Sequence, residues 1–383
     1  GVDISQGHEP EPYTVTGVVW DGTNGRVAWG YQGVSVARVD AGGQVLDPGG
    51  VAVAGLRTGP MAPSPSGGLE IAWDAFDVSL ANSYDVLAAA ISSGNAAGPV
   101  QTLSVGAPMQ VFPAVAIGSA GSMLVYRSDV SGARRVMAQP LDTAGDPLTA
   151  APVELDLGDS SNGPGVPAVA WNGALYLVVW NNSSGVVAQR ILQDGTRVDA
   201  SPFGVMPGFG PTDVAALGNT FLVTGLRAPS NPQYVGPYAA RVRGTDGAVL
   251  DPSPLLLGNS YVRAISVTTL GGRWLAVWQH HATHDDPIAR TQAAFVNADG
   301  TPEAEFTVYG WYSTSSYTYG PAVASNGSAA FTVQNAEISS GVELDLVGRT
   351  VNADGSLQPA ITLTPWAGNQ YRPRVAGAGS HFV

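Results

Sequence analysis

Residues 167–205, PAVAWNGALYLVVWNNSSGVVAQRILQDGTRVDASPFGV, contain one complete unit of a repeat that decides the fold. Short apolar runs such as LYLVVW alternate with the turn sequences WNGA, NNSSG and LQDG. Glycine and asparagine in these turns supply the positive φ angles that tight hairpins need, and apolar runs of this length are typical of β-strands. The unit therefore predicts four short strands joined by turns.

The same pattern recurs along the chain. Clear copies are PAVAIGSAGSMLVYRSDVSGARRVMAQPLDTAGDPL, GGRWLAVWQHHATHDDPIARTQAAFVNADGTPEAEFTV and PAVASNGSAAFTVQNAEISSGVELDLVGRTVNADGSLQPAITL. The repeats start near residues 15, 62, 113, 167, 212, 263, 321 and 373, a spacing of about 45 to 58 residues. A strand-built repeat of this period indicates the blades of a β-propeller. We predict an all-β fold of four-stranded antiparallel blades that forms a single domain over residues 1–383.

Seven units are complete, and an eighth is split between the chain ends. Residues 1–14 contain a candidate fourth strand, and residues 372–383 a candidate first strand with the beginning of a second. One end would then complete the blade begun by the other, as is common in propellers. Eight blades are therefore favoured, with seven as the alternative. The complete blades are expected at residues 15–61, 62–112, 113–166, 167–211, 212–262, 263–320 and 321–371.

Composition narrows the classes of partner. The 383 residues are 44% hydrophobic and 12% charged, which suits a chain that buries a large core. There is no lysine, so 17 arginines face 30 acidic residues and the net charge is −13. Without clustered basic side chains, neither nucleic acid nor an anionic membrane surface is an expected partner. The chain has no cysteine and no apolar run near about 18 residues, so we expect neither disulfides nor a membrane span.

Several recurring residues have structural interpretations. The DG turns lack the further carboxylates of a calcium loop, so turn chemistry explains them. Arginines on the third strand are expected to bind neighbouring acidic groups or carbonyls: Arg38, Arg190, Arg241 and Arg349. Large rings that close the second strand are expected to pack between blades. These are Trp29, Trp73, Tyr126, Trp180 and Trp278, with Val223 and Val333 marking the corresponding region of the other two repeats.

The loops differ between the two ends of the predicted blades. Turns after the first and third strands are short and uniform, whereas loops after the second strand and connections between blades are long and different in every repeat. Recognition usually belongs to the variable loops of a rigid scaffold. One sector of this variable end combines aromatic rings with histidine, aspartate and asparagine, a set that suits a sugar or a protein surface. Its candidate ligand-binding residues are Trp311, Tyr312, Tyr317, Tyr319, Trp366, Asn369, Tyr371, His280, His284 and Asp285.

Within that sector, QHHATHDDP at residues 279–287 admits three interpretations. The first is a divalent metal site built from His281, His284 and Asp286, although adjacent histidines on an extended segment point in opposite directions. The second is a histidine general base, for which no partner nucleophile is identifiable. The third is a solvated loop tip whose polar residues at most help hold a ligand. We take the third as the default, so no cofactor is expected.

The repeat resembles the secreted or surface-attached propeller repeats of GC-rich bacteria, including myxobacterial types, in its LVVW…R…DG pattern. The resemblance covers nearly the whole chain and implies a fold and a bacterial surface setting, without an activity. The chain departs from WD40 repeats, because it lacks their Gly-His and Trp-Asp pairs. It also departs from sialidases, because it lacks an S-x-D-x-G-x-T-W box.

The leading functional hypothesis is a non-enzymatic recognition or adhesion protein, secreted or on the cell surface, that binds glycan or a surface protein. One alternative is a structural part of a larger extracellular assembly with other subunits. Another is a propeller glycoside hydrolase or lyase, which needs two carboxylates about 5 to 10 Å apart. Carboxylates on or near the variable end are Asp85, Asp129, Asp213, Asp285 and Asp286.

Overall fold

A computed structural model gives the fold of the chain. Every regular element in its described part is a β-strand. The structure describes residues 14–21, 23–30, 34–40, 44–53, 61–63, 68–77, 83–103, 110–130, 133–157, 165–227, 236–259, 261–281, 288–313, 320–337, 344–362, 375, 377–378 and 381–382.

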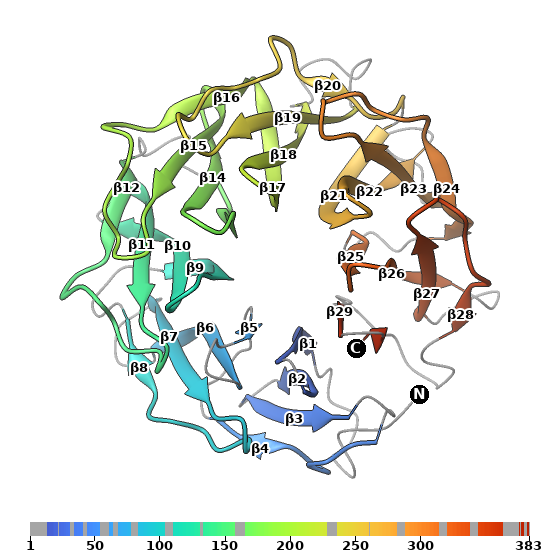
Figure 1. The fold of residues 1–383 in the computed structure, drawn as a ribbon. Helices are drawn as coiled ribbons and strands as arrows, with labels where there is room; N and C mark the ends of the chain where they lie inside the picture. Colours follow the sequence, from blue (N-terminus) through green and yellow to red (C-terminus); the bar gives the residue numbers. More distant parts are fainter. Residues whose placement is uncertain are drawn as a thin grey trace. The chain divides into compact units, whose positions relative to one another are not determined.

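Seven sheets, each of four antiparallel strands in chain order, make up the fold, a seven-bladed β-propeller (Figure 1). We name these sheets blades A to G. The chain divides into two compact units, and blades A to D belong to the unit at Val2–Pro207 while blades E to G belong to the unit at Gly208–Phe382. The all-β, four-stranded prediction is therefore confirmed. None of the described residues forms a helix of the length and apolarity that crossing a bilayer requires.

Blades A to D contain sixteen strands, β1 to β16. Blade A contains β1 (Thr14–Trp20), β2 (Gly25–Gly30), β3 (Ser35–Val39) and β4 (Val51–Ala52). Blade B contains β5 (Met61–Pro63), β6 (Leu69–Asp77), β7 (Ser83–Ile91) and β8 (Gln101–Thr102). Blade C contains β9 (Gln110–Ile117), β10 (Ser122–Val130), β11 (Ala133–Leu141) and β12 (Val153–Leu157). Blade D contains β13 (Ala168–Trp171), β14 (Tyr176–Asn182), β15 (Gly185–Ile191) and β16 (Phe203–Pro207).

Blades E to G contain the next twelve strands. Blade E contains β17 (Phe209–Leu217), β18 (Thr220–Arg227), β19 (Pro237–Arg243) and β20 (Leu255–Leu256). Blade F contains β21 (Tyr261–Leu270), β22 (Arg273–His281), β23 (Ile288–Val296) and β24 (Phe306–Ser313). Blade G contains β25 (Ala322–Ser325), β26 (Ala329–Glu337), β27 (Leu344–Asn352) and β28 (Ile361–Thr362).

The preference for eight blades is wrong. After blade G, the strands β29 (Gly377–Ala378) and β30 (His381–Phe382) are two residues long and pair only with each other in the described part of the chain. A hairpin of this size cannot replace a four-stranded sheet, because an isolated two-stranded hairpin buries too little apolar surface. The Phe382 ring instead stacks on Phe331 of blade G, with ring centroids 5.5 Å apart. The other half of the predicted split blade was residues 1–14, of which 1–13 lie outside the described residues and Thr14 begins β1.

Successive blades of a unit pack face to face through alternate positions of their second strands. Between blades C and D, Met123 and Val125 of β10 meet Tyr176, Val178 and Trp180 of β14 in one buried cluster. Because neighbouring residues of a strand point to opposite faces, each second strand has one face for the preceding blade and one for the next. The first strands of neighbouring blades also lie side by side, as β5 does with β9 and β17 does with β21.

The aromatic rings at the end of the second strand fill these interfaces, as predicted. Trp73, Tyr126, Trp180 and Trp278 are each 0% exposed, and each lies in a cluster that joins two blades. Trp180 also donates its indole N–H to Asp156 Oδ2 of the preceding blade at 2.7 Å. The side chain of Trp29 lies outside the described residues.

Strand register corrects the assignment of two repeats. Trp180 lies four residues after Tyr176, the β14 residue that pairs with Ile191, and Ile191 forms a bridge with Arg197 across the turn that follows β15. The equivalent bridges of blades E and G start at Val242 and Val351, which pair with Phe221 and Ala330. Four residues further on, Gly225 of blade E and Gln334 of blade G take the place of the ring. Val223 and Val333 are buried but lie two residues and one residue earlier. Blades E and G therefore lack the large ring that the repeat otherwise supplies at this position.

The uniform turns behave as the sequence predicts. Asp142, Asp194, Asp299 and Asp354 each accept a hydrogen bond from the backbone N–H two residues later. The glycine that follows in each turn has a positive φ, for example +88° at Gly195. These carboxylates therefore close turns, which is the usual role of aspartate in such sequences.

The third-strand arginines bind acidic groups and carbonyls, also as predicted. Arg38 pairs with Asp47, Arg190 with Asp199 and Arg241 with Asp251, at 2.5 to 2.8 Å. Arg349 is one residue out of step, because Thr350, not Arg349, occupies the position equivalent to Arg190. Arg349 instead donates to the carbonyl oxygens of Gln358 and Val308, at 2.7 and 2.8 Å.

Candidate functional site

The first two histidines of QHHATHDDP belong to a strand, which corrects the prediction of a loop tip. Strand β22 continues to His281 because it is paired on both sides to its end: His280 lies between Val262 and Arg290, and His281 lies between Tyr261 and Ala289. Their exposed fractions are 7% and 1%, so both side chains are buried, not solvated.

Burial determines the charge of His280. Removal from water lowers its pKa to about 4, and the positive charges of Arg290 and His281 add to this effect. A histidine with this pKa is neutral at pH 7, so it offers one hydrogen-bond donor and one acceptor rather than a positive charge. His280 therefore suits contacts with uncharged polar groups.

The histidine segment and the aromatic segment leave the same end of blade F. Ala289 of β23 pairs with His281 on one side and with Tyr312 of β24 on the other, and Ile288 pairs with Ser313. With neighbouring strands about 4.8 Å apart, the backbones of His281 and Tyr312 are separated by about 10 Å. The described backbone thus ends both strands at the same edge of blade F, and the convergence of the two segments on one binding sector stays a prediction. The side chains of Trp311 and Tyr312 lie outside the described residues.

Most of the remaining predicted site also lies outside the described residues. This holds for His284, Asp285, Asp286, Tyr317, Tyr319, Trp366, Asn369 and Tyr371. The metal interpretation depends on two of these residues, and it stays a prediction. Among the residues that are described, no three histidine or carboxylate side chains gather closely enough to hold a metal ion.

Sequence reasoning missed a group of buried polar side chains on blades F and G, formed by Gln279, Thr291 and Gln334. Gln334 of blade G is 3% exposed and takes the place of the inter-blade ring. The Thr291 hydroxyl of blade F donates a hydrogen bond to Gln334 Oε1. Gln279, which pairs with Thr291 across β22 and β23, is buried as well. The signal in the sequence was the glutamine itself, at the repeat position where five other blades have Trp or Tyr.

Two of the carboxylates named for a hydrolase have structural partners. Asp129 forms an ion pair with Arg127 of the same strand at 3.0 Å. Asp213 of β17 accepts backbone N–H groups from Val214 and, at 2.9 Å, from Val267 of β21. Asp213 thereby connects the first strands of blades E and F.

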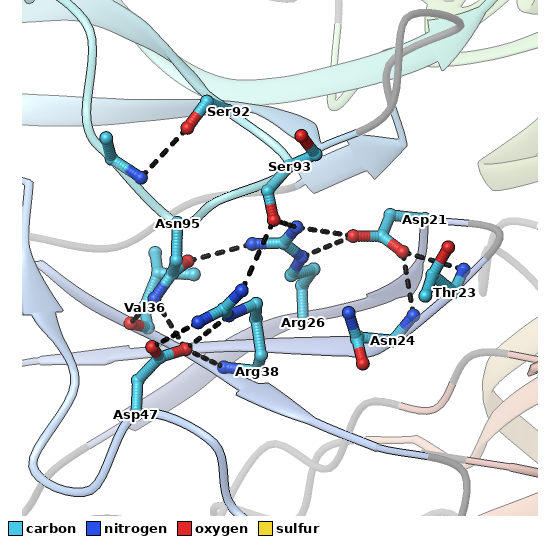
Figure 2. Close-up of polar contacts among 11 residues, drawn as sticks. Asp21, Thr23, Asn24, Arg26, Val36, Arg38, Asp47, Ser92, Ser93 and Asn95 are labelled. Atoms are coloured by element: carbon cyan, nitrogen blue, oxygen red, sulfur yellow. Dashed lines mark hydrogen bonds and ion pairs between the residues drawn. The ribbon is translucent and has the colours of Figure 1, made fainter.

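A second polar cluster, between blades A and B, was also missed (Figure 2). Arg26 is fully buried and binds Asp21 at 2.5 Å. It also donates to Asn95 Oδ1 at 2.9 Å and to the Ser93 carbonyl at 2.8 Å. The Asn95 amide donates onward to Asp47. Because the described donors and acceptors are matched to one another, this cluster is suited to holding two blades together.

Comparisons with known proteins support the fold. No family model and no curated protein sequence matches this chain. A candidate 6-phosphogluconolactonase from Bacteroides fragilis NCTC 9343 is similar in structure at a TM-score of 0.52 and 12% identity, over 98% of both chains. A puromycin hydrolase is similar at a TM-score of 0.54 and 14% identity, over 94% of this chain and 55% of that one.

A prolyl endopeptidase structure is similar at a TM-score of 0.54 and 12% identity, over 92% of this chain and 49% of that one. Identities this low carry no activity from one protein to another, since one fold serves many functions. The comparisons therefore identify this chain by its fold, as a β-propeller.

Proposed function

We propose that this protein is a non-enzymatic recognition propeller, secreted or on a bacterial surface, that binds glycan through the variable end of blade F together with the segment that follows blade G. The observation that carries the proposal is the pairing of Ala289 with both His281 and Tyr312. It supports a single binding surface, because the His-rich segment at 282–287 and the aromatic segment at 314–319 both continue from this end of the sheet.

The chemistry of the sector favours a neutral glycan over an acidic one. Aromatic rings stack on the apolar faces of sugars, and a neutral imidazole exchanges hydrogen bonds with hydroxyl groups. His280 contributes no positive charge at pH 7, because its pKa is about 4. The net charge of −13 also repels polyanions such as sulfated glycans.

The test is a glycan array that contains matched neutral and sulfated glycans, followed by titration calorimetry on the best neutral ligand. We expect neutral glycans to bind, and Trp311→Ala combined with Trp366→Ala to weaken binding about tenfold or more, because buried aromatic anchors carry most of the energy of a typical interface. The melting temperature should stay nearly unchanged.

Phe112→Ala is the matched control, because Phe112 is an exposed ring (45%) in another blade. It should leave the affinity intact. A large drop in melting temperature in the double variant would show that the two tryptophans belong to the core. Blank results from both the array and a surface-protein pull-down, with folded protein, would contradict the proposal.

A further inference from the structure

Glu70 is a buried acid of blade B that faces blade C. The other blades have a larger or apolar side chain at the same repeat position. Glu70 follows the first residue of β6, and the same position in the other blades is held by Arg26, Met123, Leu177, Leu222, Leu275 and Phe331. Glu70 is 2% exposed. A carboxylate is rarely buried so deeply unless a positive charge accompanies it.

The partners of Glu70 are neutral. The Ser122 hydroxyl of β10, in blade C, forms a hydrogen bond with Glu70 Oε2. The second oxygen, Oε1, is buried and makes no hydrogen bond within the described part of the chain. One hydroxyl replaces only a small part of the hydration that an ionised carboxylate loses on burial, so this environment favours the protonated form.

The titratable groups that act on Glu70 are acids. Asp142, in the turn after β11 of blade C, repels a negative charge on Glu70. Tyr176 of β14, in blade D, is fully buried and donates its hydroxyl to the Gly121 carbonyl. Burial and the charge of Glu70 raise the pKa of Tyr176, so it also remains protonated at neutral pH. Burial and Asp142 raise the pKa of Glu70 to about 7.

We propose that Glu70 is a proton-operated switch in the interface between blades B and C, which packs tightly with the acid protonated and loosens when it ionises. The turn at 118–121 is the expected site of loosening. It lies between Glu70 and Tyr176, and a methyl group added at Gly118 would collide with the Tyr176 hydroxyl, so the contact leaves no spare room.

The direction of the pH effect follows from linkage. In the unfolded chain, Glu70 has the ordinary glutamate pKa of 4.5, whereas in the folded protein its pKa is about 7. The folded state therefore binds more protons between these values, and its stability falls as pH rises. The contribution of protonated Glu70 is fully present below pH 4.5 and is lost as pH rises through about 7.

The experiment measures urea unfolding of the full chain from pH 4 to 9. Relative to Glu70→Gln, the unfolding equilibrium constant of the wild type should rise on the order of 100-fold over this range. In native protein, hydrogen exchange at residues 118–122, corrected for the intrinsic rate, should accelerate above pH 7 in the wild type and not in Glu70→Gln.

Two further variants keep Glu70 and shift its titration in opposite directions. Ser122→Ala removes the hydrogen bond that favours the charged form, so the inflection should move to higher pH. Asp142→Asn removes a repelling charge and keeps the turn acceptor, so the inflection should move to lower pH. Glu154→Gln, at a partly exposed acid paired with Arg135, is the control and should leave the inflection in place. Identical profiles for the wild type and Glu70→Gln would overturn the proposal, and so would inflections that fail to move in these directions.

Discussion

At the scale of single residues, Asn95 shows how one substitution in a repeat can specialise an interface. The equivalent turn position is glycine in other blades, for example Gly145 and Gly195, with φ of +84° and +88°. Asn95 keeps this conformation at +66° and adds a side chain that reaches blade A. Its amide donates to the Val36 carbonyl at 3.1 Å, and its oxygen accepts from Arg26.

Two substitutions at Asn95 separate its backbone role from its side-chain role. Asn95→Gly should cost about 1–3 kcal/mol, because it leaves the fully buried Arg26 with one partner fewer. Asn95→Ala should cost about 1–2 kcal/mol more, because alanine at positive φ is strained. Urea unfolding measures both values.

Ser93→Ala is the matched control, since only the backbone carbonyl of Ser93 binds Arg26. It should have little effect. Equal losses in the Gly and Ala variants would mean that the backbone conformation at position 95 is not a constraint.

At the scale of strands and sheets, the ring that ends the second strand carries much of the packing between blades. Trp180 is fully buried and its indole N–H is hydrogen-bonded to Asp156. Trp180→Ala should lower the free energy of unfolding by about 3–5 kcal/mol, because it leaves a large cavity.

Trp180→Phe fills most of that cavity but leaves Asp156 without the indole donor, so a smaller loss of about 1–3 kcal/mol is expected. Denaturation curves of both variants provide the measurement, with Leu148→Ala, an exposed residue of the same unit, as control. Losses below about 1 kcal/mol in Trp180→Ala would refute the assignment of this ring to the core.

The sequence predicts elements better than it predicts register. Strands, turns and buried rings follow from local composition, which is why Trp73 and Asp194 take their expected roles. Arg349 and Val333 each lie one residue before the repeat position predicted for them, and a shift of one residue moves a side chain to the other face of a strand. The turn after β27 does not cause this shift, because the bridge Val351–Leu357 encloses as many residues as Ile191–Arg197 does in blade D.

The candidate site was predictable only in part, for a related reason. His280 and His281 looked like loop residues because polar side chains seldom continue a buried strand, yet pairing with β21 and β23 extends β22 through both. Pairing between strands is not a local property of the sequence. Nothing in LEIAW signals that Glu70 faces a neighbouring blade instead of water.

At the scale of the whole molecule, the net charge can be counted directly from the sequence. A net charge of −13 produces self-repulsion in the compact state, and salt screens that repulsion. The buried pair Arg26–Asp21 is screened much less than exposed charges are. Raising sodium chloride from about 10 to about 150 mM, where the Debye length is about 8 Å, should therefore raise the melting temperature.

Differential scanning calorimetry at pH 7 checks this expectation. A matched series in sucrose, which strengthens burial without screening charge, separates the two effects. A melting temperature that falls with added sodium chloride would show that favourable ion pairs outweigh the general repulsion.

The alternation of faces along each second strand has a consequence for how such a chain can lengthen. Blade C presents one surface that fits its predecessor and another that fits its successor, both formed by β10. A tandem copy of one blade could thus pack against the blades on both sides through surfaces that already exist. Gene duplication can therefore lengthen this architecture one blade at a time. Later substitutions of an apolar residue by arginine, glutamate or glutamine can then make each interface between blades chemically different.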